Sequence, residues 1–189
     1  MALSLICTNR FSVQNILDID LHAPLNSFVR SCPHYRIILS SVHAASDGYD
    51  YPCLETPDEL RASSYCTLKF DPFRGVNCSD AAGRERTFAD IMEVLSKDPT
   101  ASNASFDEST QTPFFNYDVN GTAHQIWYDD KVSSAAKYGV AADMGVRGTG
   151  PFCFGDLSYA SKESREQARG MWDALRSYKA KRHDAIRRG

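Results

Sequence analysis

The clearest pattern of hydrophobic and polar positions lies between residues 123 and 154. Ala123–Tyr128 is aromatic and β-branched, which predicts a strand. Apolar residues then recur at helical spacing, which predicts a helix with one apolar face. The residues of that face are Val132, Ala135, Ala136, Val140 and Met144. Val146–Phe154 is apolar again and contains glycine. The pattern therefore predicts a strand, a crossover helix and a second strand of one parallel sheet.

The predicted helix has a start signal and a stop signal. Asp129 or Asp130 can cap its first turn, because a short carboxylate accepts hydrogen bonds from the free amide groups there. Gly145 can end the helix, because glycine adopts the left-handed backbone conformation at low cost.

A hairpin is predicted immediately before this helix. Pro113–Asp118 and Ala123–Tyr128 are two strand-like runs on either side of Asn120-Gly121. Asn-Gly favours a two-residue hairpin turn, because both turn positions need a positive φ.

Two more helices follow from apolar periodicity. One begins after Thr87 as a capping residue, with Asp90 three positions further on. Its apolar residues are Phe88, Ile91, Met92 and Leu95. The other is capped by Ser161 or Ser164, and its apolar stripe consists of Ala168, Met171, Trp172, Leu175 and Tyr178.

The other segments carry weaker patterns. Tyr35–Val42 is a candidate strand by its β-branched content. Gly48 opens a long segment predicted to be irregular, and residues 97–112 are predicted to be a polar surface loop. The basic tail at residues 179–189 has no apolar periodicity, so we expect it to fray.

Composition narrows the possible functions. The chain has 189 residues, 42% hydrophobic residues and a net charge of −3, which suits one packed domain or part of a larger one. The charge favours neither nucleic acid nor an acidic membrane surface as a partner, and no apolar run is long enough to span a membrane. The first residues resemble no signal peptide, because they lack a basic region and a clear cleavage site.

The cysteines and sequons indicate the secretory pathway, in conflict with the predicted lack of a signal peptide. None of the six cysteines forms a C-x-x-C pair, so no zinc site is predicted. Cys53, Cys66 and Cys78 lie close together in sequence, as in a disulfide-stapled loop, although free buried thiols remain an alternative. N-glycosylation sequons occur at Asn77, Asn103 and Asn120.

Several strings in one order carry a family resemblance. They are GYDYPC, PFRGVNCSDAAGR, PFFNYD, HQIWYDD, GVRGTG and the closing helix with Met171-Trp172. From residue 48 to residue 178 the chain resembles the chitobiase branch of glycoside hydrolase family 18. The resemblance implies an α/β fold, the C-terminal fragment of a (β/α)8 TIM barrel.

The same resemblance assigns parts of the chain to this barrel. It implies an α+β insertion after the seventh strand at residues 48–118, the seventh helix at 129–145, the eighth strand at 146–154 and the eighth helix at 161–178. Residues 1–47 are an unmatched N-terminal segment, and residues 179–189 form the basic tail. The chain is too short for all eight strand–helix units of a barrel of about 250 residues.

The resemblance implies hydrolysis of chitooligosaccharides at β-1,4 links beside N-acetylglucosamine, by a retaining, substrate-assisted mechanism. In the family the general acid is the glutamate of D-x-x-D-x-D-x-E. Asn15–His22 (NILDIDLH) lacks that glutamate, and is either a coincidence or a degraded copy. No catalytic residue is therefore assigned, and we expect this chain to be inactive alone. The alternative is a non-catalytic remnant that binds carbohydrate or protein.

Three residues match sugar-contacting positions of the family. Phe152 stands where the family has a tryptophan under the cleaved sugar, and Tyr128 and Asp129 lie at the end of a strand beside the cleft. Each has a structural alternative, namely core packing for Phe152, hairpin packing for Tyr128 and helix capping for Asp129. His124 is expected to be a solvated strand residue and Trp127 a core residue.

The family resemblance also implies a cellular location and partners. The parent family is lysosomal or extracellular, and its partner is a chitooligosaccharide or another glycan that contains N-acetylglucosamine. The resemblance implies no cofactor. A fragment of a barrel exposes strand edges and helix faces, so we expect self-association when this chain is expressed alone.

Overall fold

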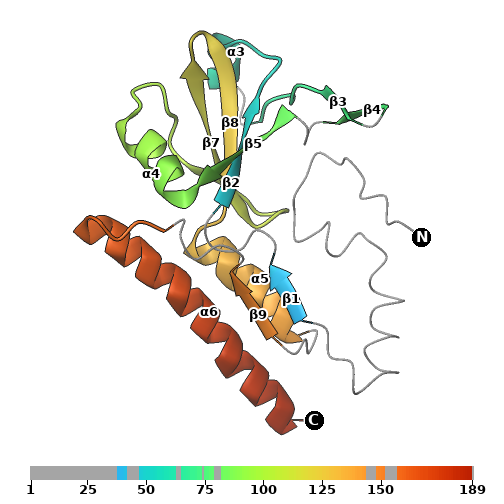
Figure 1. The fold of residues 1–189 in the computed structure, drawn as a ribbon, viewed down its shortest axis with the longest axis vertical. Helices are drawn as coiled ribbons and strands as arrows, with labels where there is room; N and C mark the ends of the chain where they lie inside the picture. Colours follow the sequence, from blue (N-terminus) through green and yellow to red (C-terminus); the bar gives the residue numbers. More distant parts are fainter. Residues whose placement is uncertain are drawn as a thin grey trace.

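The computed structural model describes residues 38–41, 47–62, 65–73, 75–78, 82–143, 148–151 and 157–188. In chain order the strands and helices are β1 (Ile38–Ser41), β2 (Asp47–Pro52), α3 (Pro57–Ala62), β3 (Asp71–Phe73), β4 (Val76–Cys78), β5 (Arg84–Thr87), α4 (Phe88–Lys97), β6 (Ser105–Asp107), β7 (Thr112–Val119), β8 (Thr122–Tyr128), α5 (Lys131–Asp143), β9 (Gly148–Pro151) and α6 (Lys162–Arg188). Figure 1 shows a sheet with α3 and α4 at one end of the molecule, and β1, β9, α5 and α6 towards the other end.

The larger sheet has five antiparallel strands in the order β5-β2-β8-β7-β6. Two of its strands correct the sequence analysis. β2 is an interior strand, although an irregular segment was expected from Gly48, and β6 lies within the predicted surface loop. β2 gains its regular structure by pairing with β5 on one side and β8 on the other. This pairing depends on distant parts of the chain, so local patterns do not reveal it.

The predicted hairpin is confirmed as β7 and β8. Asn120 has a φ of 53° and Gly121 a φ of 82°, the left-handed values that a two-residue hairpin turn requires. The carboxylate of Asp118 accepts a hydrogen bond of 2.6 Å from the amide of Gly121, which holds the turn closed. The Asn-Gly pair therefore fixes the register of the two longest strands.

One face of this sheet forms the main core. The apolar side of α4 packs on it, and the residues that precede and begin α6 complete the cluster. Its buried members are Phe88, Ile91, Phe115, Tyr117, Ile126, Tyr128, Leu157, Ala168 and Met171. The predicted start of α4 is also confirmed, because the hydroxyl of Thr87 accepts from the amide of Asp90 at 3.1 Å.

A second cluster joins α5 to α6. It consists of Tyr138, Ala141, Ala142, Ala174 and Tyr178. The sequence analysis therefore chose the wrong face of α5 as the buried one. Val132 is 50% exposed, whereas Ser133 and Ser134 are fully buried. Small residues allow α5 to approach α6 closely, and this close approach decides which face is buried.

The parallel sheet forms between other strands than the sequence predicts. β9 pairs in parallel with β1, from Ile38↔Gly148 to Ser41↔Pro151, while β8 belongs to the antiparallel sheet. β8 already has strand partners on both sides, so it cannot also pair with β9. The candidate strand at residues 35–42 is confirmed as β1.

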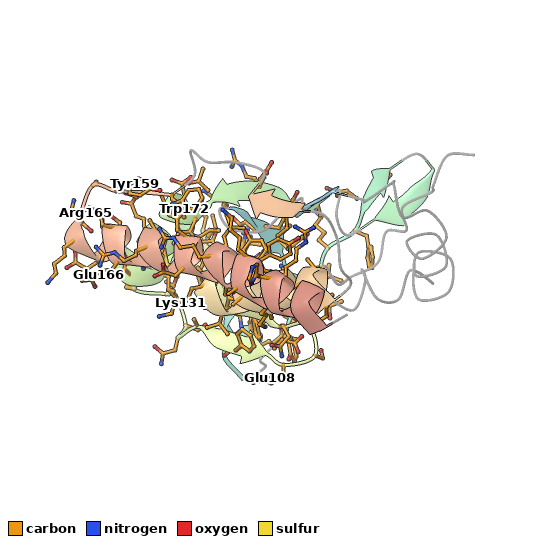
Figure 2. All side chains as sticks on the ribbon, turned by 90° about the horizontal axis from the view of Figure 1, so that it is seen from below. Glu108, Lys131, Tyr159, Arg165, Glu166 and Trp172 are labelled. Carbon is orange, nitrogen blue, oxygen red and sulfur yellow. A yellow bond between two sulfur atoms is a disulfide. The ribbon has the colours of Figure 1, made fainter. Side chains whose placement is uncertain are left out.

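Helix α6 continues to Arg188 through the basic segment where we expected fraying. Lysine, arginine and alanine are good helix formers, which compensates for the missing apolar stripe. Ser161 is the cap, because its hydroxyl accepts from the amide of Ser164 at 3.0 Å. Figure 2 shows α6 running across the molecule, with Tyr159 close to Trp172. Within the described ranges, no helix combines the length and apolar character that a bilayer crossing requires.

Candidate functional site

The residue after β8 links this strand to α5. Asp129 is 2% exposed, and its two carboxylate oxygens lie 2.5 and 2.7 Å from Nζ of Lys137. The hydroxyl of Ser133 donates a further hydrogen bond of 2.8 Å to Asp129. Asp130, not Asp129, caps α5, because its carboxylate accepts from the amides of Val132 and Ser133 at 2.8 and 2.9 Å. Asp129 therefore serves as a buried anchor for α5.

Tyr128 lies at the same strand end, and its ring belongs to the main core. The ring is 6% exposed and makes an edge contact with Phe115 and a tilted contact with Phe88. Burial, together with the nearby charge of Asp130, raises the pKa of Tyr128 to about 12. Its hydroxyl therefore stays protonated at neutral pH and can act as a hydrogen-bond donor.

The third predicted sugar contact, Phe152, falls outside the described residues, directly after β9. The structure places Tyr128 and Asp129 next to each other but cannot join them to Phe152. The role of these three residues in sugar binding stays a prediction.

The sequence analysis missed a buried carboxylate in β2. Asp50 is 3% exposed and accepts four hydrogen bonds from three side chains. Arg86 donates from Nε and Nη2 at 3.2 and 2.9 Å, and the hydroxyl of Tyr117 donates at 2.6 Å. Nδ1 of His124 lies 2.7 Å from the other carboxylate oxygen. We call these four residues the Asp50 network.

Electrostatics keep the carboxylate of Asp50 ionised. Burial pushes the pKa of Asp50 upward, but the hydrogen bonds from His124, Tyr117 and Arg86 outweigh it and lower this pKa below its ordinary value. Since an ionised carboxylate only accepts hydrogen bonds, Nδ1 of His124 carries the proton of their shared bond. Burial and the bond to Asp50 raise the pKa of Tyr117.

The Asp50 network also corrects the interpretation of His124. Its side chain is only 18% exposed and contacts the ring of Tyr117, whereas a solvated strand residue was expected. The four residues come from β2, β5, β7 and β8, so no local spacing reveals them. The available signal was one acidic residue within the aromatic run GYDYPC.

These carboxylates do not suit proton donation at neutral pH. Among the described carboxyl groups with a resolved pKa shift, every shift is downward; they are Asp50, Glu55, Glu59, Asp107 and Glu163. A general acid for glycoside hydrolysis needs the opposite, a pKa raised towards the working pH.

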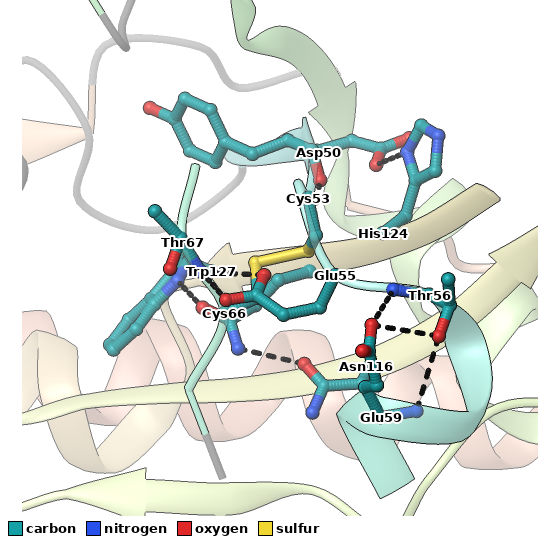
Figure 3. The surroundings of a disulfide bond; sticks show 12 residues. Asp50, Cys53, Glu55, Thr56, Glu59, Cys66, Thr67, Asn116, His124 and Trp127 are labelled. Carbon is teal, nitrogen blue, oxygen red and sulfur yellow. Dashed lines mark hydrogen bonds and ion pairs between the residues drawn. A yellow bond between two sulfur atoms is a disulfide. The ribbon is translucent and has the colours of Figure 1, made fainter. Parts of the chain in front are cut away.

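A disulfide joins the residue directly after β2 to the segment after α3. Cys53 and Cys66 are joined with a Cα–Cα distance of 5.7 Å, which confirms a staple in this segment. Beside it, the carboxylate of Glu55 accepts from the amide of Thr67 at 2.8 and 2.9 Å (Figure 3). Both sulfur atoms are used in the covalent bond, so they are not available as metal-binding thiolates in this state.

The predicted glycosylation sites lie in three different settings. Asn103 is exposed in the segment between α4 and β6, and Asn120 is exposed in the hairpin turn. Asn77 lies in the short strand β4. Their modification stays a prediction.

Comparison with known proteins gives close sequence relatives and more distant structural ones. No protein-family model matches the chain. Over 131 residues the chain is 37% identical to the di-N-acetylchitobiase of Mus musculus and 34% identical to that of Homo sapiens. The match covers 68% of this chain and 34% of the mouse protein. The chain therefore spans about a third of the length of the curated relatives it matches.

A solved structure agrees at the level of the fold. The crystal structure of the Ostrinia furnacalis Group IV chitinase is similar with a TM-score of 0.57 and 13% sequence identity. The similarity covers 95% of this chain and 43% of that chain. Identity this low supports a shared fold and no more.

Proposed function

We propose that the chain belongs to the chitobiase branch of glycoside hydrolase family 18 and forms the C-terminal part of a chitooligosaccharide-cleaving hydrolase, because two thirds of it match the di-N-acetylchitobiases in sequence. The observation that carries this proposal is the identity of 37% over 131 residues. In this proposal residues 48–178 are the glycosidase part that matches the relatives, β1 (Ile38–Ser41) adds one strand from the unmatched N-terminal segment, and residues 179–189 lie outside it.

The arrangement of the elements supports a barrel fragment. In a (β/α)8 barrel neighbouring strands run parallel, and each strand is followed by a helix. β1 and β9 are parallel neighbours, and α5 precedes β9 while α6 follows it. We assign β1 to the place of the seventh strand, α5 to the seventh helix, and β9 and α6 to the eighth unit. The antiparallel sheet between β1 and α5 is then the insertion.

We infer that the general acid and the sugar contacts come from different parts of the complete barrel. Substrate-assisted hydrolysis needs a carboxylic acid to protonate the leaving oxygen. The sequence lacks the glutamate of the D-x-x-D-x-D-x-E motif that does this in the family. The general acid then belongs to the barrel portion that this chain does not match. In this proposal the chain supplies sugar contacts at its strand ends through Phe152 and the hydroxyl of Tyr128, while the buried Asp129 anchors α5 behind them.

A secreted or lysosomal setting suits this assignment. The disulfide between Cys53 and Cys66 is typical of proteins that fold in an oxidising compartment. The exposed sequons at Asn103 and Asn120 would be accessible to glycosylation there. The second candidate function, a non-catalytic carbohydrate- or protein-binding remnant, is favoured by the lack of the acidic motif in the sequence.

A chimera tests the proposed function. The mouse di-N-acetylchitobiase sequence upstream of the match is joined before Gly48, and a fluorogenic chitobioside is the substrate. We expect hydrolysis by the chimera and none by this chain alone. A chimera in which the motif glutamate of the mouse part is changed to glutamine controls for contaminating activity.

Each contrary result has a defined meaning. Hydrolysis by this chain alone would overturn the placement of the general acid outside it. A chimera that melts cooperatively but leaves the substrate intact would overturn the hydrolase assignment in favour of the non-catalytic alternative.

A further inference from the structure

The face of the five-stranded sheet opposite α4 carries a group of aromatic rings. Trp127 of β8 stands between Tyr49 of β2 and Phe114 of β7 as their cross-strand neighbour. Tyr65, from the segment after α3, stacks over this face. We call Tyr65, Phe114 and Trp127 the aromatic platform.

The three rings of the aromatic platform are nearly parallel. The centroids of Phe114 and Trp127 are 4.6 Å apart with an interplanar angle of 20°. Tyr65 lies 5.0 Å from Phe114 at 22° and 6.1 Å from Trp127 at 9°. Phe114 is buried, Trp127 is partly exposed and Tyr65 is 51% exposed. Tyr65 and Trp127 therefore present flat aromatic surface to solvent, and the buried ring of Phe114 supports them.

Hydrogen bonds and a disulfide hold the platform in place. Nε1 of Trp127 donates to Gln125 at 2.8 Å, and Gln125, itself 1% exposed, donates to Asn116 at 2.7 Å. These bonds fix the plane of the indole. Tyr65 directly precedes Cys66, whose disulfide to Cys53 ties this segment to the end of β2 (Figure 3). An ordered platform loses little conformational entropy when a ligand binds.

We propose that the aromatic platform binds one pyranose ring of an N-acetylglucosamine oligosaccharide, at a subsite separate from the Tyr128–Asp129 strand end. The sugar class rests on the proposed function. The ring stacking rests on the geometry, because the axial C–H face of a pyranose covers a flat aromatic ring with apolar contact. Polar groups of Glu55, Thr67 and Asn116 lie around the platform and can face sugar hydroxyls.

The size of the platform favours a sugar over a protein partner. An aromatic side chain buries about 150–250 Å² when fully covered, so the two exposed rings offer less than about 500 Å². A stable protein interface needs about 800 Å² from each partner. One sugar ring needs no more than the platform provides.

A titration with N,N′,N″-triacetylchitotriose tests the proposal. The chain has two tryptophans, so W172F leaves Trp127 as the reporter of fluorescence. We expect the trisaccharide to change the Trp127 emission and Tyr65→Ala to weaken the Kd about tenfold. Tyr65→Phe keeps the ring, so its Kd should stay within about twofold. The matched control is Tyr159→Ala, because Tyr159 is 50% exposed like Tyr65 but lies beside Trp172 and outside the platform.

Three outcomes would overturn the proposal. The first is a Kd for the trisaccharide that is the same with Tyr65→Ala as with the unaltered platform. The second is that Tyr159→Ala weakens binding as much as Tyr65→Ala does. The third is that Tyr65 mediates formation of a dimer and the chain binds no sugar. Thermal melts of each variant separate loss of the platform from loss of the fold. If the platform binds the trisaccharide but the chimera does not hydrolyse its substrate, only the proposed function is contradicted. If the chimera hydrolyses its substrate but Tyr65→Ala does not change binding, only the platform proposal is contradicted.

Discussion

At the scale of single residues, the Asp50 network predicts a large loss of stability from a single substitution. Asp50→Asn keeps the size of the side chain but removes the charge that faces Arg86 and His124. Breaking a buried ion pair from one side costs about 3–5 kcal/mol. Arg86 is 30% exposed, so we expect a loss of about 3 kcal/mol in the free energy of unfolding at pH 7. Urea unfolding followed by circular dichroism measures this loss.

The same network predicts a pH dependence with a defined sign. The pKa of Asp50 is lower in the folded chain than its ordinary value of 3.8. Its contribution to stability is therefore complete above 3.8 and is lost as the pH falls through the lower, folded-state pKa. The difference in stability between the unaltered chain and Asp50→Asn should therefore stay constant from pH 7 to about 4 and shrink as the pH falls below 3.8.

An exposed carboxylate serves as the control for both measurements. Glu93 pairs with Lys97 on the surface of α4, where ion pairs contribute about 0–1 kcal/mol. Glu93→Gln should therefore change stability little at either pH. A pH-independent gap between the unaltered chain and Asp50→Asn would contradict the electrostatic account of the network.

At the scale of elements, β2 and β8 approach α4 so closely that only glycine fits at position 48. A Cβ there would lie 2.5 Å from the carbonyl oxygen of Trp127, 2.6 Å from Cδ1 of Ile91 and 2.8 Å from Cβ of Tyr128. Gly48→Ala should cost about 3 kcal/mol or more, because two of these neighbours are backbone or Cβ atoms that cannot rotate away. A Cβ added at Gly150 would meet no atom within 4 Å, so Gly150→Ala is the matched control. Equal melting temperatures for the two variants would contradict this packing.

Local sequence patterns predicted the helices, strands and turns well, but they did not predict which elements pair or pack together. The Asn120-Gly121 turn, the Thr87 cap and the Ser161 cap follow from short-range hydrogen bonding and backbone preference, and the structure confirms all three. The direction of α5 and the pairing of β9 depend on which distant element is nearby. For the same reason Asp50 went unnoticed, since its partners are 36 to 74 residues away.

At the scale of the whole molecule, the described elements leave surfaces that a complete barrel would cover. β1 and β9 form a sheet of only two strands. The outer face of α5 carries Val132 at 50% exposure, with Ala136 and Val140 partly exposed. These residues lie one helical turn apart and form an apolar stripe directed away from α6. In the proposed barrel this stripe is available to a neighbouring element from the portion that the chain does not match.

The stripe leads to a prediction about the isolated chain. Expressed alone, it should bind a hydrophobic dye and elute as species larger than 21.0 kDa, because exposed apolar surface favours association. The double variant Val132→Lys and Val140→Lys should bind less dye and shift towards the monomer, while Glu93→Gln should change neither property. Light scattering after size exclusion measures the mass, and a thermal melt measures cooperativity. A monomeric chain that melts cooperatively and binds no dye would contradict the barrel-fragment proposal, since a free-standing domain would then already bury its apolar faces.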